Sequence, residues 1–385
     1  MICIQNAKVV LETGILWDGV ILVDGDRLAA VGKRSGVEVP ADAQIMDAQG
    51  AYVGPGFVDI HAHGAGGHSF VVEPEQAAAY FLSRGTTTVL PTLYTSLDKQ
   101  EYLDAIAMLR RVRQSGPARI IGGFYMEGPY MNPDFGASPH KNKWRGDIVP
   151  ERYKDVVDAA GELARVWVVA PEREGIEEFV RYAKSVNPDV VFSVGHSRAT
   201  PTQIRKLKKY GLNHLTHCMD ATGQVSEWLG TRGAGPDEAC FLDADMYAEL
   251  ISDSGAVHVN PDLQRLILKQ KGVDKVVLIS DCSARGEEPN IPEGLRHMTD
   301  LSFDEQGNLG GSKLSMDMAC RNIMTHTNCG IAQAFLMASG NPARSVGLDD
   351  EVGSIEVGKR ADLVFVDDMF HVQKVMLAGQ LQPLA

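Results

Sequence analysis

The chain has 385 residues, a hydrophobic content of 44% and a formal net charge of −13. A chain of this length can bury one large core and a smaller one, and its acidity argues against a nucleic-acid partner. No run approaches the roughly 18 apolar residues of a membrane span, and residues 1–10 contain no signal-like segment. Six scattered cysteines without a Cys-x-x-Cys pair favour a cytoplasmic protein with reduced thiols.

Short strands separated by turns are predicted for residues 1–50. Apolar runs at 7–11, 19–23 and 27–31 are bounded by turn residues, and Asp24-Gly25 is a hairpin signal. Strands are expected again at 353–359, 362–366 and 372–377. We therefore expect residues 1–50 and 350–385 to form one small β-sandwich domain built from both termini.

The region between these segments, residues 51–349, alternates strand candidates with helical stretches. Asn260-Pro261 before an apolar stripe, with Gly272 after it, predicts one of these helices from cap to stop. The pattern predicts a (β/α)8 TIM-like barrel, and a doubly wound parallel sheet is the alternative. The eight strand candidates cover residues 52–63, 87–92, 120–127, 166–171, 190–196, 213–217, 248–252 and 276–281.

The most informative single feature is His61-Ala62-His63, which ends the first strand candidate. Residues two apart on a strand point to the same face, so His61 and His63 could bind one metal ion together. A His-x-His pair alone is weak evidence, and its meaning depends on whether the chain supplies further ligands.

Other strand candidates also end in side chains that can bind metals. Glu127, His196 and Asp281 end the third, fifth and eighth, while His214 and His217 lie in the sixth. In a barrel these ends converge on the face where active sites lie. Imidazole and carboxylate ligands suit Zn²⁺, and also Fe²⁺, Mn²⁺ or Co²⁺. A water at an open coordination position, with Asp281 as its base, would hydrolyse an amide or a similar bond.

Motifs across nearly the whole chain add a resemblance to a known family. They comprise residues 54–64, 126–130, 170–172, 195–200, 213–219, 280–281, 341–344 and 353–363. With these motifs the sequence resembles the amidohydrolase superfamily and, within it, the N-acetylglucosamine-6-phosphate deacetylases.

The resemblance implies a centre for one or two divalent ions, with zinc as the first choice. It assigns the principal ion to Glu127, His196 and His214. A second ion would be held by His61 and His63, with Glu127 as a bridge. Asp281 would be the catalytic acid and base. His140 resembles the histidine that polarises the acetyl carbonyl.

Substrate contacts follow from the same resemblance, with two departures. His217 stands where the family usually has an asparagine that helps to hold the substrate, and Arg232 lacks the usual spacing of the phosphate-binding arginine. His258 resembles the histidine near the sugar phosphate, and in a homodimer it would reach the partner's site. Cys218 lies beside the site residues and is expected either to bind substrate or to pack as a small apolar residue.

A basic segment follows Glu127. His140, Lys141, Lys143 and Arg145 surround Trp144. One interpretation is a lid whose cations bind an anionic sugar substituent while Trp144 packs on the ring. The other is a solvated basic loop.

These observations predict a metal-dependent enzyme that hydrolyses the N-acetyl amide of an amino-sugar phosphate, such as N-acetylglucosamine-6-phosphate. The alternative is an amidohydrolase for another N-acylated amino sugar, an N-acyl amino acid or a cyclic amide. A non-catalytic protein of this fold is a third interpretation, which the complete ligand set and Asp281 disfavour. We expect a small-molecule substrate and a homodimer.

Overall fold

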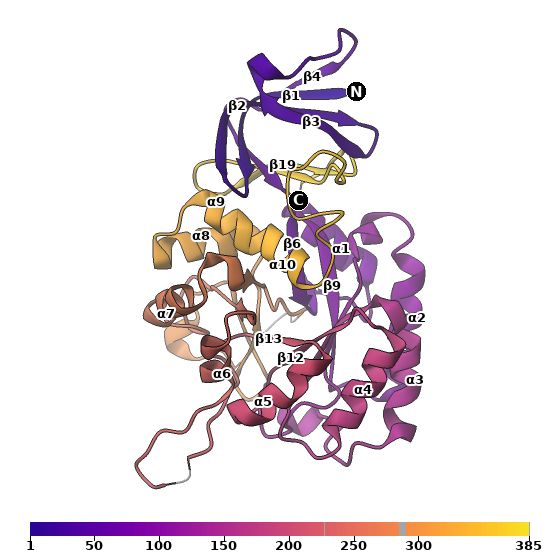
Figure 1. Ribbon diagram of the computed structural model, residues 1–385, viewed down its shortest axis with the longest axis vertical. Coiled ribbons are helices and arrows are strands. Elements are labelled where there is room, and N and C mark those ends of the chain that lie inside the picture. Colours follow the sequence, from indigo (N-terminus) through magenta and orange to yellow (C-terminus); the bar gives the residue numbers. More distant parts are fainter. Residues whose placement is uncertain (227, 285–289, 385) are drawn as a thin grey trace.

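The computed structural model describes residues 1–226, 228–284 and 290–384. A sheet built from both ends of the chain lies at one end of the molecule, and a barrel surrounded by helices lies at the other (Figure 1). No helix in the described part of the chain has both the length and the apolar character that a membrane crossing requires.

The predicted barrel is confirmed. Every neighbouring pair in its sheet is parallel, in the order β15-β14-β13-β12-β11-β10-β9-β6, and a parallel bridge from Ala62 to Cys282 brings the first and last strands together. The strands are β6 (Phe57–Ala62), β9 (Thr86–Tyr94), β10 (Phe124–Glu127), β11 (Ala164–Val169), β12 (Val191–Val194), β13 (Leu212–Leu215), β14 (Tyr247–Leu250) and β15 (Val276–Leu278).

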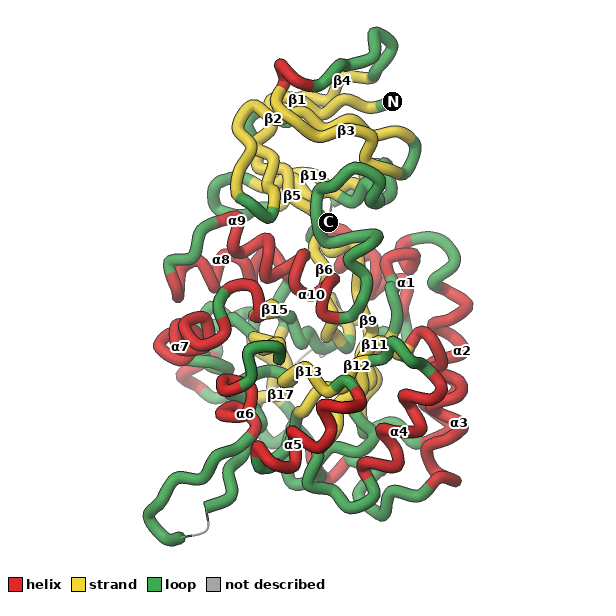
Figure 2. Tube along the Cα trace, in the orientation of Figure 1, coloured by secondary structure: helices red, strands yellow, loops and turns green. Residues whose placement is uncertain are grey.

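Helices cover the outside of the barrel, as the red and yellow layers of Figure 2 show. They are α1 (Pro74–Ser83), α2 (Lys99–Val112), α3 (Pro150–Ala160), α4 (Ile176–Val186), α5 (Pro201–Leu207), α6 (Pro236–Leu242), α7 (Pro261–Lys271), α8 (Met316–Thr327), α9 (Ile331–Phe335) and α10 (Asn341–Ser345). The predicted start and stop of α7 are confirmed, because Asn260 accepts from the Asp262 amide and Gly272 adopts φ +68°.

Both faces of the barrel strands are buried. Along β11, Val166 and Val168 pack in the interior cluster, whereas Trp167 and Val169 pack against the helices. This double burial explains why the strands read as continuous apolar runs rather than as alternating ones.

The terminal segments form one mixed sheet. Its order is β20-β19-β18-β5-β1-β2-β3, with β4 also paired to β1. Side chains from both ends of the chain share one hydrophobic cluster there, for example Val9, Val53 and Phe365. The strands are β1 (Ile2–Leu11), β2 (Gly14–Asp24), β3 (Arg27–Lys33), β4 (Gln44–Asp47), β5 (Tyr52–Pro55), β18 (Leu363–Val366), β19 (Val372–Leu377) and β20 (Gln380–Gln382).

Three expected strands differ in detail. The candidate at 52–63 is two strands, because the chain leaves β5 and enters β6 at Gly56, whose Cβ position would lie 2.1 Å from the Thr87 hydroxyl. The candidate at 120–127 begins only at Phe124, after a 3-10 turn over Pro117–Ile120. The strand expected at 353–359 is wrong: this segment is made of turns, with Gly353 and Gly358 at φ +92° and +93°.

Candidate active site

The polar side chains expected at the strand ends meet at the carboxyl-terminal mouth of the barrel. His61 lies in β6 and His63 directly follows it, while Glu127 is the last residue of β10. His196 and His217 each lie two residues beyond the end of a strand, β12 and β13. Five side chains from four strands therefore converge at the end of the barrel where active sites lie in this fold.

The backbone just beyond these strands has an unusual conformation. His196, His217 and Asp281 have φ values of +46°, +32° and +46°. A left-handed conformation costs a residue with a side chain on the order of 1–2 kcal/mol, and such strain gathers at functional sites. Here His196 and His217 direct their side chains toward Glu127, and Asp281 directs its carboxylate toward His61 and His63.

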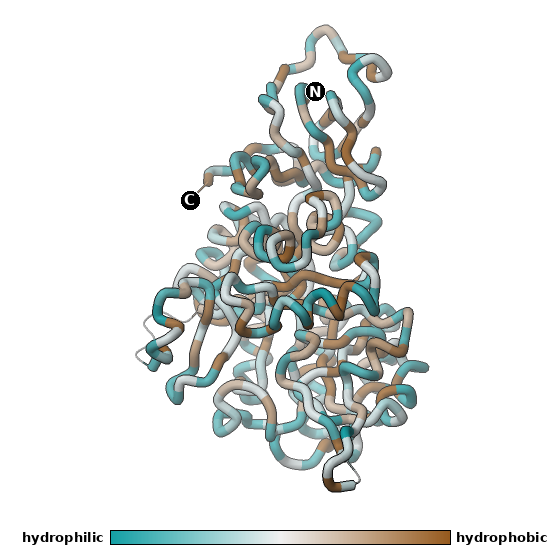
Figure 3. Tube along the Cα trace, turned by 90° about the vertical axis from the view of Figure 1, so that its left-hand side faces the viewer, coloured by the Kyte–Doolittle hydropathy of each residue, from teal (hydrophilic) through white to brown (hydrophobic). Residues whose placement is uncertain are grey.

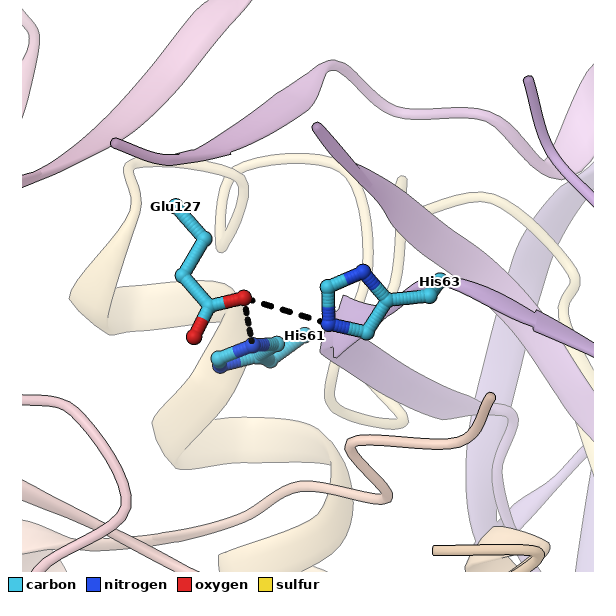
Figure 4. Close-up of side chains that lie close together, drawn as sticks. All are labelled: His61, His63 and Glu127. Carbon is cyan, nitrogen blue, oxygen red and sulfur yellow. Dashed lines mark ion pairs between the residues drawn. The ribbon is translucent and has the colours of Figure 1, made fainter. Parts of the chain in front are cut away.

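Glu127 is the centre of the cluster. Its Oε1 lies 2.8 Å from His196 Nε2 and 3.5 Å from His217 Nε2. Its Oε2 lies 3.1 Å from His63 Nε2 and 3.4 Å from His61 Nε2 (Figure 4). One carboxylate therefore contacts two pairs of imidazoles through different oxygens.

Asp281 adds a second carboxylate beside two of the same imidazoles. Its Oδ1 lies 3.2 Å from His63 Nε2 and 3.6 Å from His61 Nε2. Burial raises the pKa of Asp281, but the charges of the two imidazoles and the hydrogen bond from His63 outweigh burial and leave the pKa lowered. Asp281 is therefore a carboxylate at neutral pH and can accept a proton.

The charges in the cluster stabilise one another. Burial opposes the charge on Glu127, yet His61, His196 and His217 hold its pKa well below the usual value. Burial likewise opposes the charge on His63, but Asp281 and Glu127 raise its pKa to about 9. The carboxylates of the cluster are therefore negatively charged and face imidazole nitrogens. A bound cation could balance the same negative charge.

The residues fit a metal centre. Two ligand groups share Glu127: His61 and His63 with Glu127, and Glu127 with His196 and His217. The buried His61 Nε2 and Glu127 Oε2 have no hydrogen-bond partner among the described residues, and both point into the first group. Mixed imidazole and carboxylate ligands suit zinc and neighbouring divalent metals.

His214, expected as a ligand, joins neither group within the described part of the chain. It lies inside β13, where its buried ring stacks on Tyr247 at 5.3 Å between centroids. Burial lowers its pKa to about 4. His217 stands beyond the strand end, and its Nε2 lies 3.0 Å from His196 Nε2. We therefore replace His214 by His217 in the ligand set and withdraw the interpretation of His217 as a substrate contact in place of an asparagine.

A cavity of about 590 Å³ opens above the cluster. It reaches Glu127, His63, His196, His217 and Asp281, so these side chains are open to a small molecule. Cavities of this size hold small ligands. The rest of the wall includes Tyr94, Ser138, Lys141, Asp220, Ala221, Ser283 and Gly311.

Three further sequence expectations lie away from this cavity. His140 is exposed and absent from the described lining, whereas its neighbours Ser138 and Lys141 line it. Arg232 is exposed and pairs with Glu238 at 2.6 Å. Cys218 is buried, and its thiol contacts Asp237 at 3.7 Å, so it packs behind the wall.

His258 also lies behind the wall. Its Nδ1 is 3.0 Å from Asp253 Oδ2 and its Nε2 is 3.2 Å from the Gly311 carbonyl. Both partners are acceptors, so both bonds form only when the ring is protonated. His258 thus supports Gly311, a cavity residue that lies against Asp281, rather than reaching the cavity itself.

The lid expected around Trp144 is wrong in its central element. Trp144 is buried, donates its indole N–H to the Leu97 carbonyl at 2.7 Å, and packs against Tyr102 and Tyr130. Lys143 pairs with Glu101 at 2.8 Å, outside the cavity. A tryptophan between two charged residues, Lys143 and Arg145, can also anchor a loop to the core, and Trp144 does so in the structure.

Sequence reasoning missed several residues of the site. Tyr94 packs edge-on against His63 and His196, and Glu249 contacts His61 from the barrel interior. Glu249 stands in the strand candidate at 248–252, where a carboxylate within an apolar run was the available signal. Asp220 lies in the turn after His217. It could have been predicted as a site residue if the family's ligand histidine had been aligned with His217 instead of His214.

Comparisons with known proteins agree with this geometry. A model of the amidohydrolase family matches residues 52–381. An N-acetylgalactosamine-6-phosphate deacetylase of Escherichia coli O157:H7 is 28% identical over 98% of both chains. An N-acetylglucosamine-6-phosphate deacetylase of Bacillus subtilis is 27% identical over 98% of this chain and 96% of its own.

Solved structures extend the likeness to three dimensions. The N-acetylglucosamine-6-phosphate deacetylase of Pasteurella multocida superposes with a TM-score of 0.86, at 27% identity over 99% of both chains. A mutant of the Mycobacterium smegmatis N-acetyl-D-glucosamine-6-phosphate deacetylase, in complex with N-acetyl-D-glucosamine-6-phosphate, gives 0.82 at 28% identity, over 99% of this chain and 98% of its own.

Proposed function

The chain belongs to the amidohydrolase family, and on that premise we propose that it is a metal-dependent deacetylase of N-acetyl amino-sugar phosphates. The reaction is hydrolysis of the N-acetyl amide of N-acetylglucosamine-6-phosphate to glucosamine-6-phosphate and acetate. The observation that carries this proposal is the paired ligand group around Glu127, which opens with Asp281 into one cavity.

His196, His217 and Glu127 would hold the principal ion, and His61 and His63 would share Glu127 with a second. Zinc suits this ligand set best. When bound, a divalent ion lowers the pKa of water and polarises a carbonyl oxygen. The shared carboxylate supports a centre for two ions, although one group alone could suffice.

The chain's own residues supply the proton transfers. Asp281 faces the cavity with its Oδ1 directed toward His63, so it can take a proton from water and later give it to the departing amine. The side chain is about nine-tenths buried, which excludes most competing water. Tyr94 packs on the rings of His63 and His196 and forms part of the cavity wall beside them.

Recognition of a phosphate would rest on Lys141. It is the only lysine or arginine in the described lining of the cavity, and it pairs with Glu305. A substrate phosphate carries more charge than this carboxylate and could replace it as the partner of the ammonium group. His140 has no part in this role or in catalysis in our proposal.

A second candidate function is favoured by Asp220. Its carboxylate lines the same cavity as Lys141, and a phosphate placed near it would be repelled. This observation favours an uncharged N-acylated amino sugar as the alternative substrate.

We further propose that the protein is a cytoplasmic homodimer. All six cysteines are thiols, which is compatible with a reducing compartment. The loop that leads into α6, residues 223–226 and 228–235, projects from the barrel (Figure 1) and is apolar at its tip (Figure 3). Trp228 and Leu229 on this projecting loop are 74% and 107% exposed, and a second copy would cover them.

A substrate screen tests the function. Acetate release is measured for N-acetylglucosamine, N-acetylgalactosamine and the 6-phosphate of each. Our proposal predicts the highest kcat/KM for a 6-phosphate. Turnover of the unphosphorylated sugars alone would favour the second candidate, and no acetate from any of the four would overturn both.

A further inference from the structure

Behind the metal ligands, the barrel interior holds a carboxylate that the proposed reaction does not use. Glu249 lies in β14 and is fully buried. The Tyr125 hydroxyl lies 2.9 Å from both of its oxygens, and His61 Nδ1 lies 3.3 Å from Oε2. A buried carboxylate is costly unless it is well hydrogen-bonded, so these contacts define its orientation.

The same contacts define the ring of His61. It stacks on Tyr125 with 4.2 Å between centroids and an interplanar angle of 28°. A carboxylate only accepts hydrogen bonds, so Nδ1 carries the proton that faces Glu249. His61 Nε2 then faces Glu127 Oε2, 3.4 Å away, and is the nitrogen left to bind an ion.

Among the described residues, the Nδ1 atoms of His196 and His217 have no carboxylate partner. His217 Nδ1 faces the Asp220 carbonyl at 3.1 Å, and the buried His196 Nδ1 has no hydrogen-bond partner among the described residues. Loss of the Glu249 charge would therefore act on the group of His61, His63 and Glu127 and spare the group of Glu127, His196 and His217.

We propose that Glu249 is a positioning residue that holds the ring and tautomer of His61 and thereby sets the affinity of the group of His61, His63 and Glu127 for its ion. The inference rests on the proposed metal centre but not on the identity of the substrate. Partners that orient a ligating histidine typically change metal affinity by about 10–100-fold.

The main chain of the same residue has a separate function. The Cys218 amide donates to the Glu249 carbonyl at 2.7 Å and so anchors the turn that carries His217. A Glu249→Gln substitution leaves this bond and the side-chain volume in place, so its effect reports on the carboxylate.

The test is metal binding to the full-length protein. Wild type, Glu249→Gln and a control, Ser193→Ala, are stripped with chelator, dialysed against buffered Co²⁺ and analysed for ions per subunit. Ser193 bonds Thr216 at 2.5 Å, and Thr216 bonds Tyr125 at 2.9 Å, so the control alters the same network away from His61. We expect two ions in wild type and control. In Glu249→Gln we expect one ion unchanged and one bound about 10–100-fold more weakly.

A double variant tests whether Glu249 acts through His61. In a His61→Asn background, Glu249→Gln should weaken binding no further, because the residue on which it acts is gone. Glu249→Asp, whose shorter side chain retracts from His61, replaces Glu249→Gln if that variant does not fold.

Unchanged affinity for both ions in Glu249→Gln, or equal weakening of both, would overturn the inference. A wild type with one ion that Glu249→Gln retains would overturn it as well. None of these results would contradict the proposed reaction, which acetate release tests separately. A wild type without any bound ion would overturn both the inference and the proposed metal-dependent reaction.

Discussion

We propose that His217 rather than His214 completes the ligand group around Glu127, because a residue beyond the strand end can turn its ring into the mouth of the barrel. His217→Ala should lose the ion shared by Glu127 and His196. Its kcat should fall by more than the roughly 10–100-fold that removal of a supporting partner costs. Metal content and acetate release measure both effects.

His214→Ala is the matched control in the same segment. It should keep the wild-type metal content and lose thermal stability, because its buried ring packs on Tyr247. Metal loss in His214→Ala with full retention in His217→Ala would reverse our assignment.

His258 leads to a pH-dependent prediction. Burial lowers its pKa, but the hydrogen bond to Asp253 and the charges of Asp220, Asp253 and Asp281 outweigh burial and raise the pKa above 6.5. The protonated ring therefore stabilises the fold fully below pH 6.5, and this contribution is lost as the pH rises through the raised pKa.

His258→Gln should accordingly be destabilised most in mild acid, and the difference from wild type should narrow in alkali. Urea unfolding of both proteins at about pH 6 and about pH 9 measures the two differences. A difference that grows with pH would show that the ring is neutral in the folded protein.

At the scale of elements, the loop after β10 brings Lys141 to the wall of the cavity. Gly136 permits this placement, because a Cβ there would lie 2.6 Å from His196 Nδ1 and displace the loop. Lys141→Ala should raise KM for a phosphorylated substrate several-fold and leave KM for its unphosphorylated analogue unchanged.

Lys143→Ala provides the comparison, because Lys143 pairs with Glu101 outside the cavity. Its kinetics should match those of wild type. Equal KM changes in the two lysine variants would remove Lys141 from substrate recognition.

The projecting loop is the element we expect to hold a second copy. If our proposed dimer forms through this loop, replacing Trp228 and Leu229 together by serine should leave a monomer of the same thermal stability, because neither side chain packs in the barrel. Light scattering measures the mass. Leu242→Ser, at an 80% exposed position on α6, should remain dimeric. A double variant of unchanged mass would place the interface elsewhere.

At the scale of the whole molecule, much of the fold could be predicted because it depends on regular patterns. Apolar runs of strand length alternating with capped helices predicted the barrel, and Asn260 with Gly272 predicted both ends of one helix. His61, His63 and Glu127 could be placed because they lie in or directly after strands, where side-chain direction follows from the strand itself.

The direction of the other site side chains was harder to predict. His196 and Asp281 were expected at strand ends, but their left-handed backbone and that of His217 do not follow from alternation. His214 was therefore expected as the ligand, whereas the structure brings His217 to Glu127 and His196. His140 and Trp144 lie in a loop whose course is set by distant contacts, such as the indole bond to Leu97. Glu249 contacts His61 across the barrel interior, and these two residues come together only when the strands close into a barrel.

We propose that the protein hydrolyses an N-acetyl amide at a metal centre in the mouth of the barrel. The most direct measurement is acetate release from N-acetylglucosamine-6-phosphate by chelator-stripped protein before and after Zn²⁺ is restored, with Asp281→Asn as a control that keeps the imidazole ligands. We predict no release from the stripped protein, recovery with Zn²⁺, and no recovery in Asp281→Asn. Equal release with and without metal, or none from the Zn²⁺-loaded wild type, would contradict the account.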